Sequence, residues 1–218
     1  MDYEYVVPDW FFTFSIGMEL LDALVAFGIA FTAYKLYRVA KEKNLKRLSI
    51  AFGFISLSYL LWASVNMIVI DQVNAGVQTV CLSCLQNIGL MGIYGYSLFF
   101  LLGISTLAYA TLSLNRPSVW YLIAGLSLTT LGASTEKFIT THISAAFILT
   151  YIIYHYMCCY TNTPYARKTL LACVLLFISN ITFLFSPQGH YAYILGHFIE
   201  FGAYALFLST LLATKKAP

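Results

Sequence analysis

Apolar residues occur in seven long runs, separated by short segments that hold most of the charged residues. A helix that crosses about 30 Å of hydrocarbon needs roughly 20 mostly apolar residues. The runs cover residues 10–34, 48–70, 84–113, 118–134, 139–160, 169–186 and 190–213. They predict an all-α bundle of seven transmembrane helices that forms one integral membrane domain over residues 1–218, with 118–134 as the shortest helix.

Composition argues against a soluble protein. Hydrophobic residues make up 60% of the 218 residues and charged residues 10%, whereas a soluble domain has roughly 45–50% and about 25%. The first apolar run follows three acidic residues, Asp2, Glu4 and Asp9, and a signal peptide needs a basic flank. We therefore expect this run to remain as the first helix of a multi-pass membrane protein.

Lys and Arg mark one side of the predicted bundle. All but one of the 12 basic residues lie in alternate connecting segments or at the C-terminus, and segment 34–48 holds the largest group. Because basic loops stay on the cytoplasmic side, this bias predicts an outside N-terminus, a cytoplasmic C-terminus and a location in the plasma (inner) membrane. We interpret segment 34–48 as a topology determinant that contacts anionic lipid headgroups, and not as a nucleic-acid-binding patch.

Two parts of the chain resemble each other faintly. Lys46-Arg47 precedes LSIAFGFISLSYLLW, and Arg167-Lys168 precedes TLLACVLLFISNITFLF, which aligns Ser58 with Ser179. The match favours a 3+1+3 plan, in which helices one to three and five to seven are parallel copies joined by helix four. The alternative is that apolar helices after a basic pair look alike without any duplication.

Helix count and orientation resemble those of two known families. Small sugar transporters of the SWEET type have helix-interior prolines, but all five prolines here lie at span ends or in connecting segments. Microbial rhodopsins attach retinal to a lysine in helix seven, and residues 190–212 contain none. Neither resemblance extends to the motifs that carry the family's chemistry.

Acidic residues inside two of the predicted spans form the main candidate site. Ser15, Glu19 and Asp22 share one face of the first helix, and His197 and Glu200 share one face of the last. At 1.5 Å per residue, Glu19 and Asp22 lie about 13 and 18 Å into the membrane, and His197 and Glu200 roughly 10 and 15 Å. If the first and last helices are neighbours, Glu19, Asp22, His197 and Glu200 form one buried cluster.

Ionisable residues in hydrocarbon are costly, so such a cluster needs partners or a function. Carboxylates with an imidazole suit a divalent metal ion, a proton relay or a cationic substrate. The leading hypothesis is a membrane protein that moves or senses a proton, a cation or a small polar solute between helices one and seven. A purely structural hydrogen-bonded lock between the two helices is the alternative.

Other residues support competing functions. His142 and His190 lie at similar outer depth and could share a metal ion or a heme, and Cys81 and Cys84 form a C-x-x-C pair suited to redox or metal chemistry. These features allow a metal- or heme-binding redox protein or enzyme in the membrane. A third alternative is a structural or assembly subunit, in a homo-oligomer or a larger membrane complex. No catalytic motif in the sequence decides whether the protein is an enzyme.

Overall fold

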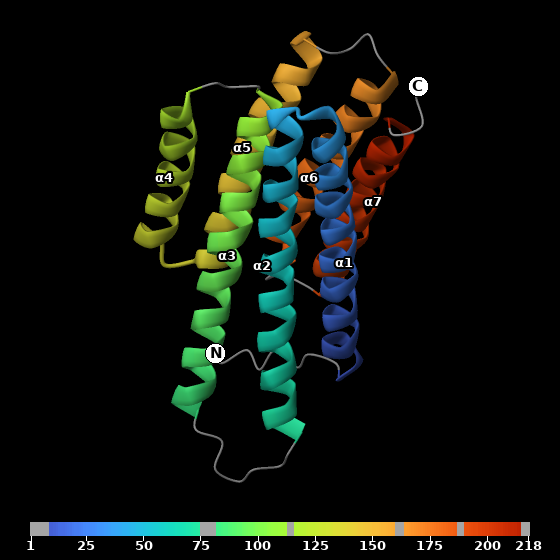
Figure 1. The fold of residues 1–218 in the computed structure, drawn as a ribbon. Coiled ribbons are helices and arrows are strands. Elements are labelled where there is room, and N and C mark those ends of the chain that lie inside the picture. Colours follow the sequence, from blue (N-terminus) through green and yellow to red (C-terminus); the bar gives the residue numbers. More distant parts are fainter. Residues whose placement is uncertain (1–8, 75–81, 113–115, 160–163, 187–189, 215–218) are drawn as a thin grey trace.

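The computed structural model describes residues 9–74, 82–112, 116–159, 164–186 and 190–214, with side chains over slightly narrower ranges. Within these residues the chain forms seven helices and no strand (Figure 1). The helices are α1 (Asp9–Ala40), α2 (Lys43–Asn74), α3 (Leu82–Thr111), α4 (Pro117–Ala133), α5 (Lys137–Cys159), α6 (Pro164–Leu184) and α7 (His190–Thr214). The predicted all-α class is confirmed.

Six of the seven described helices are long and apolar enough to cross a membrane. The exception is α4, whose 17 residues span about 26 Å at 1.5 Å per residue. Large apolar side chains face outward around the bundle, such as Leu24 at 66% exposure, Phe147 at 74% and Met91 at 78%. An exposed apolar surface of this extent is what a lipid-facing protein presents, so the chain is a multi-pass membrane protein.

Helices α1 and α2 are longer than the apolar runs that predicted them. They continue through most of the basic segment 34–48, and only Lys41 and Glu42 remain between them. Lys and Arg are good helix formers, and charged helix ends can extend beyond the hydrocarbon into the headgroup region. Lys41 has a positive φ of 57°, which ends α1 with a bond from its N–H to the Tyr37 carbonyl at 2.8 Å.

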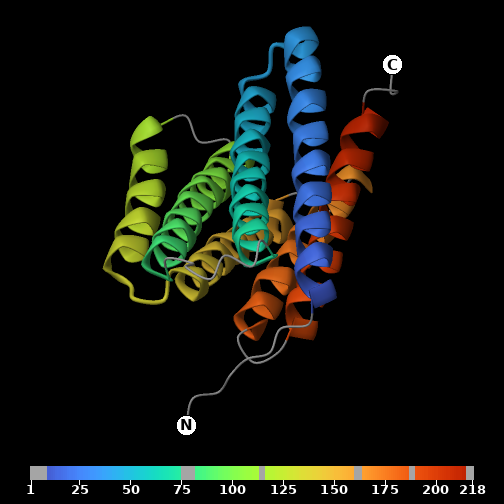
Figure 2. The ribbon, with the colours of Figure 1, turned by 90° about the horizontal axis from the view of Figure 1, so that it is seen from below.

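Six helices close into a ring, and α4 lies outside it. The contacts run from α1 to α2, α3, α5, α6 and α7 and back to α1. Among the described residues α4 contacts only α3 and α5, and Figure 2 shows it at one edge of the bundle. The α1–α2 turn, the starts of α4 and α6 and the end of α7 all lie at one end of the bundle (Figure 1).

Lys137 is the basic residue that departs from the charge bias, and its contacts explain why. Its Nζ donates hydrogen bonds to the carbonyls of Leu131 (2.9 Å), Gly132 (3.2 Å) and Ser134. These carbonyls end α4, where the helix dipole favours a cation. Lys137 therefore caps the short helix α4 from the first turn of α5.

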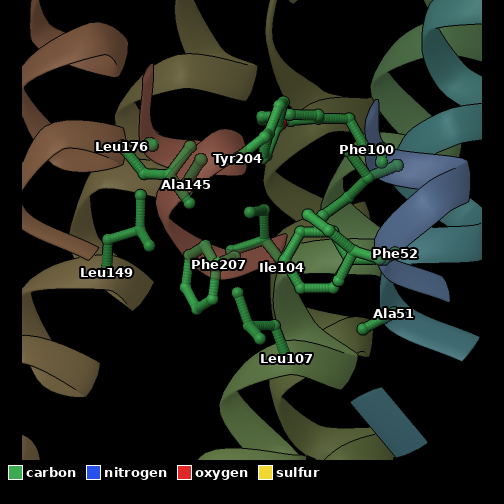
Figure 3. Packing of buried hydrophobic residues seen from close by; sticks show 14 of the residues in the cluster. Ala51, Phe52, Phe100, Ile104, Leu107, Ala145, Leu149, Leu176, Tyr204 and Phe207 are labelled. Carbon is green, nitrogen blue, oxygen red and sulfur yellow. The ribbon is translucent and has the colours of Figure 1, made fainter. Parts of the chain in front are cut away.

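The interior of the ring is packed with aromatic, leucine, isoleucine and small side chains (Figure 3). Phe52 meets Tyr204 and Phe207 edge to face, with ring centroids 6.0 and 5.3 Å apart. Close approach of α3 to α2 depends on glycine, because a Cβ at Gly103 would lie 2.6 Å from Ile55 Cγ1.

Candidate functional site

Helices α1 and α7 are in contact, as the predicted cluster requires. Glu19, Asp22 and Glu200 have no exposed surface, and His197 is 2% exposed. The i, i+3 spacing puts Glu19 with Asp22 on one face of α1, and His197 with Glu200 on one face of α7. The structure thus brings all four predicted residues into the interior of the bundle, although it divides them into two groups with different surroundings.

Glu19 is held by three hydrogen-bond donors from three helices. Its Oε1 accepts from the hydroxyls of Ser15 and Tyr193, each at 2.7 Å. The amide of Asn66 on α2 reaches both carboxylate oxygens, at 2.9 and 3.0 Å. Oε1 therefore accepts from all three donors and Oε2 from one of them, the Asn66 amide. Glu19 therefore ties α1, α2 and α7 together.

Asp22, His197 and Glu200 form a second group that is incompletely satisfied. His197 Nδ1–H donates to Asp22 Oδ2 at 2.8 Å, and the hydroxyl of Tyr204 donates to Glu200 Oε1 at 2.8 Å. Asp22 Oδ1, His197 Nε2 and Glu200 Oε2 are buried without a hydrogen-bond partner. One potential ligand atom from each residue lies within 4.8 Å of the other two. Buried polar atoms are rarely left unpaired, so water molecules, protons or an ion would be needed to satisfy these three.

The charge of the cluster is unbalanced. Three carboxyl groups meet one imidazole, whereas α7 has no Lys or Arg and α1 has none before Lys35. Removing net negative charge from water without a counter-charge is strongly unfavourable. Protons or a bound cation must therefore neutralise the buried cluster.

His142 on α5 approaches the cluster from the opposite side of the ring. Its Nδ1 lies 2.9 Å from Asn180 Oδ1, and the Asn180 amide is oriented by its own bond to the Leu176 carbonyl at 2.8 Å. Nδ1 of His142 is therefore the donor, and Nε2 carries a lone pair and has no partner. Sequence reasoning missed this contribution, because nothing in the spacing shows that α5 faces α7 across the ring.

A small cavity of about 10 Å³ is lined by both imidazoles. Its lining consists of His142, His197 and six aromatic side chains: Tyr59, Trp62, Tyr96, Phe138, Phe183 and Tyr193. That space is close to the minimum for one water molecule.

The remaining predicted site residues fall outside the part of the chain that the structure describes. Cys81 precedes α3, and the side chains of Cys84 and His190 are likewise not among those described. The heme or metal shared by His142 and His190 and the redox pair Cys81–Cys84 stay predictions. The described partner of His142 is Asn180, and its neighbour across the cavity is His197.

A larger cavity of about 500 Å³, called the vestibule below, opens at the end of the bundle that holds the α1–α2 turn. It runs from Glu42 and Tyr165 near the surface to Leu107 and Phe207 in the interior. Phe207 packs with Phe52 and Tyr204 in one aromatic layer (Figure 3). The hydroxyl of Tyr204 in turn donates to Glu200. One aromatic layer therefore separates this vestibule from the cluster.

The sequence matches no protein-family model, no curated protein and no solved structure.

Proposed function

We propose that this multi-pass membrane protein binds a small cation at the Asp22–His197–Glu200 group and carries it across the membrane. The observation that carries the proposal is the pair of buried, unpartnered oxygens, Asp22 Oδ1 and Glu200 Oε2, beside an imidazole in a group whose charges do not balance. A hydrogen-bonded lock would leave fewer such atoms unpaired, because its purpose is to satisfy both helices. Glu19, which accepts hydrogen bonds from side chains of three helices, is the structural part of the cluster.

The vestibule provides one half of the route. On α7, Glu200, Tyr204, Phe207 and Leu211 follow one face from the cluster into the vestibule. A rearrangement of the layer formed by Phe52, Tyr204 and Phe207 opens the site to this end. On the opposite side, half-buried Asn66, Trp62 and Tyr193 separate Glu19 from the other end of the bundle. Alternating opening of these two barriers moves a cation past the cluster without forming a continuous pore.

The chain has a defined orientation in the membrane and an internal repeat of three helices. The N-terminus faces outside and the vestibule opens to the cytoplasm of a plasma (inner) membrane, because the basic ends of the helices lie around it. The two three-helix sets, α1–α3 and α5–α7, are parallel copies, which the symmetric order of contacts around the ring supports. A reporter fused after Pro218 is expected in the cytoplasm. A cysteine probe at Asn74 that reacts only after permeabilisation contradicts the orientation.

Flux into liposomes tests transport. Protein reconstituted with internal pH- and metal-sensitive dyes is compared with Glu200→Gln and Asp22→Asn, which keep size and remove negative charge. We expect each variant to lose flux at least about tenfold, equivalent to about 1.4 kcal/mol. Glu136→Gln is the matched control, because Glu136 is exposed outside the ring. Near-wild-type flux in both cluster variants, or no flux in the wild type, contradicts the proposal.

A further inference from the structure

We infer that the cation taken by Asp22, His197 and Glu200 is a divalent transition-metal ion of the Mn²⁺ to Zn²⁺ series. This inference rests on the proposed function for the place of the site and adds the class of its ligand. The three residues offer one nitrogen and two carboxylate groups, and one ligand atom of each lies within 4.8 Å of the other two. An ion between them adjusts these atoms to ordinary coordination distances of about 2.0–2.2 Å from the metal.

Charge selects a dication. Asp22 and Glu200 contribute one negative charge each when ionised, and neutral His197 contributes none. A doubly charged ion therefore cancels the charge of these three residues, and Glu19 then needs one proton for the whole cluster to be neutral inside the hydrocarbon. A monovalent ion leaves one further negative charge, and α7 and the part of α1 before Lys35 hold no basic side chain to balance it.

Ligand chemistry selects the metal. Mg²⁺ and Ca²⁺ prefer six or more oxygen ligands, including waters, and the group is closed to solvent with no exposed surface on Asp22 or Glu200. Imidazole together with carboxylate suits zinc, iron and manganese at lower coordination number. Glu19 is not part of this group of ligand atoms, and its oxygens accept from Ser15, Asn66 and Tyr193.

Neighbouring side chains hold the three ligand residues in place. Tyr204 fixes Glu200 through Oε1 and leaves Oε2 unoccupied. The ion takes the place of the Nδ1 hydrogen of His197, so its ligands are this nitrogen and the unpartnered oxygens Asp22 Oδ1 and Glu200 Oε2. Nε2 then carries the hydrogen, on the ring that lines the same cavity as His142. A metal-bound histidine regularly donates its other ring N–H to a nearby acceptor.

Binding to the purified chain tests the inference independently of flux. Full-length protein in detergent micelles, stripped with a chelator, is titrated with Zn²⁺ by calorimetry and in parallel with Mg²⁺ and Ca²⁺. We expect one high-affinity Zn²⁺ per chain and at least hundredfold weaker binding of Mg²⁺ and Ca²⁺. Asp22→Asn, Glu200→Gln and His197→Phe should each weaken Zn²⁺ binding at least tenfold, and thermal unfolding of each variant checks that the fold persists.

Glu136→Gln is the control, because it removes an exposed carboxylate away from the cluster. Its Zn²⁺ affinity should stay within about threefold of wild type. No saturable Zn²⁺ binding, equal binding of Mg²⁺, or equal losses in Glu136→Gln and Glu200→Gln overturns the inference. If Zn²⁺ does not bind while flux still depends on Glu200, the metal inference fails and the proposed function stands. Tight Zn²⁺ binding without any flux refutes transport and leaves the metal site.

Discussion

Gly196→Ala tests how tightly α6 and α7 pack beside His197. A Cβ at Gly196 would lie 2.7 Å from Cε1, 2.9 Å from Cδ1 and 3.0 Å from Cζ of Phe183, closer than carbon atoms pack. The Phe183 ring is 2% exposed and touches His142 and His197, with centroids 4.8 and 5.0 Å away. It cannot swing into open space, so the added methyl must separate the two helices.

The expected cost follows from overpacking. Forcing an extra methyl into a packed interior destabilises by roughly 1–3 kcal/mol, partly offset by about 0.5–1 kcal/mol from replacing a helical glycine with alanine. Gly202→Ala, on the same helix, is the matched control, because nothing lies within 4 Å of its added Cβ. We expect Gly202→Ala to be neutral or stabilising and Gly196→Ala to be destabilising by roughly 1–2 kcal/mol.

Reversible unfolding in mixed detergent micelles gives the free energies of unfolding of the two variants and of wild type. Gly196→Ala should cost less free energy of unfolding in a Phe183→Leu background than in wild type, because the smaller side chain makes room for the added methyl. The difference between the two costs is the coupling energy of the pair. If Gly196→Ala is as stable as Gly202→Ala, or if Phe183→Leu gives no coupling, the packing argument is refuted.

Three further outcomes are expected. Asn180→Ala should lower the free energy of unfolding by about 1–2 kcal/mol, because it leaves Nδ1 of buried His142 unpaired, as measured in the same micelles. Lys41→Gly should raise it by about 1 kcal/mol, because glycine accepts a φ of 57° without the penalty of a side chain, and an unchanged value contradicts this. Trp120→Phe removes the 3.0 Å bond to Thr106 Oγ1 and should speed amide hydrogen exchange in α4 while leaving exchange in α7 unchanged.

Local periodicity was sufficient to predict part of the site. The apolar runs locate the helices, and the i, i+3 pairs Glu19–Asp22 and His197–Glu200 lie on the faces that α1 and α7 turn toward each other. Such predictions succeed because the face on which a residue lies depends only on helix geometry. The extent of α1 and α2 was underestimated, because charged helix ends outside the hydrocarbon carry no apolar signal.

Long-range pairing could not be predicted. The bond between His142 and Asn180 joins α5 to α6, and Asn66 reaches Glu19 from α2, yet a single sequence does not say which polar groups on different helices meet. For the same reason, the sequence does not distinguish the roles of Glu19 and Glu200, which are both acidic residues within predicted spans. Their difference is the number of donors that surround each carboxylate, which depends on the order of helices around the ring.

The position of α4 outside the ring affects how the chain divides into parts. Because α3 contacts α5 directly, the ring closes through interfaces that do not include α4. The contribution of α4 is to return the chain, so that α1 and α5 both run from the same end of the bundle (Figure 1). Two polypeptides divided between α3 and α4 thus retain every interface of the ring, and the protein is suited to reassembly from fragments that insert into the membrane separately.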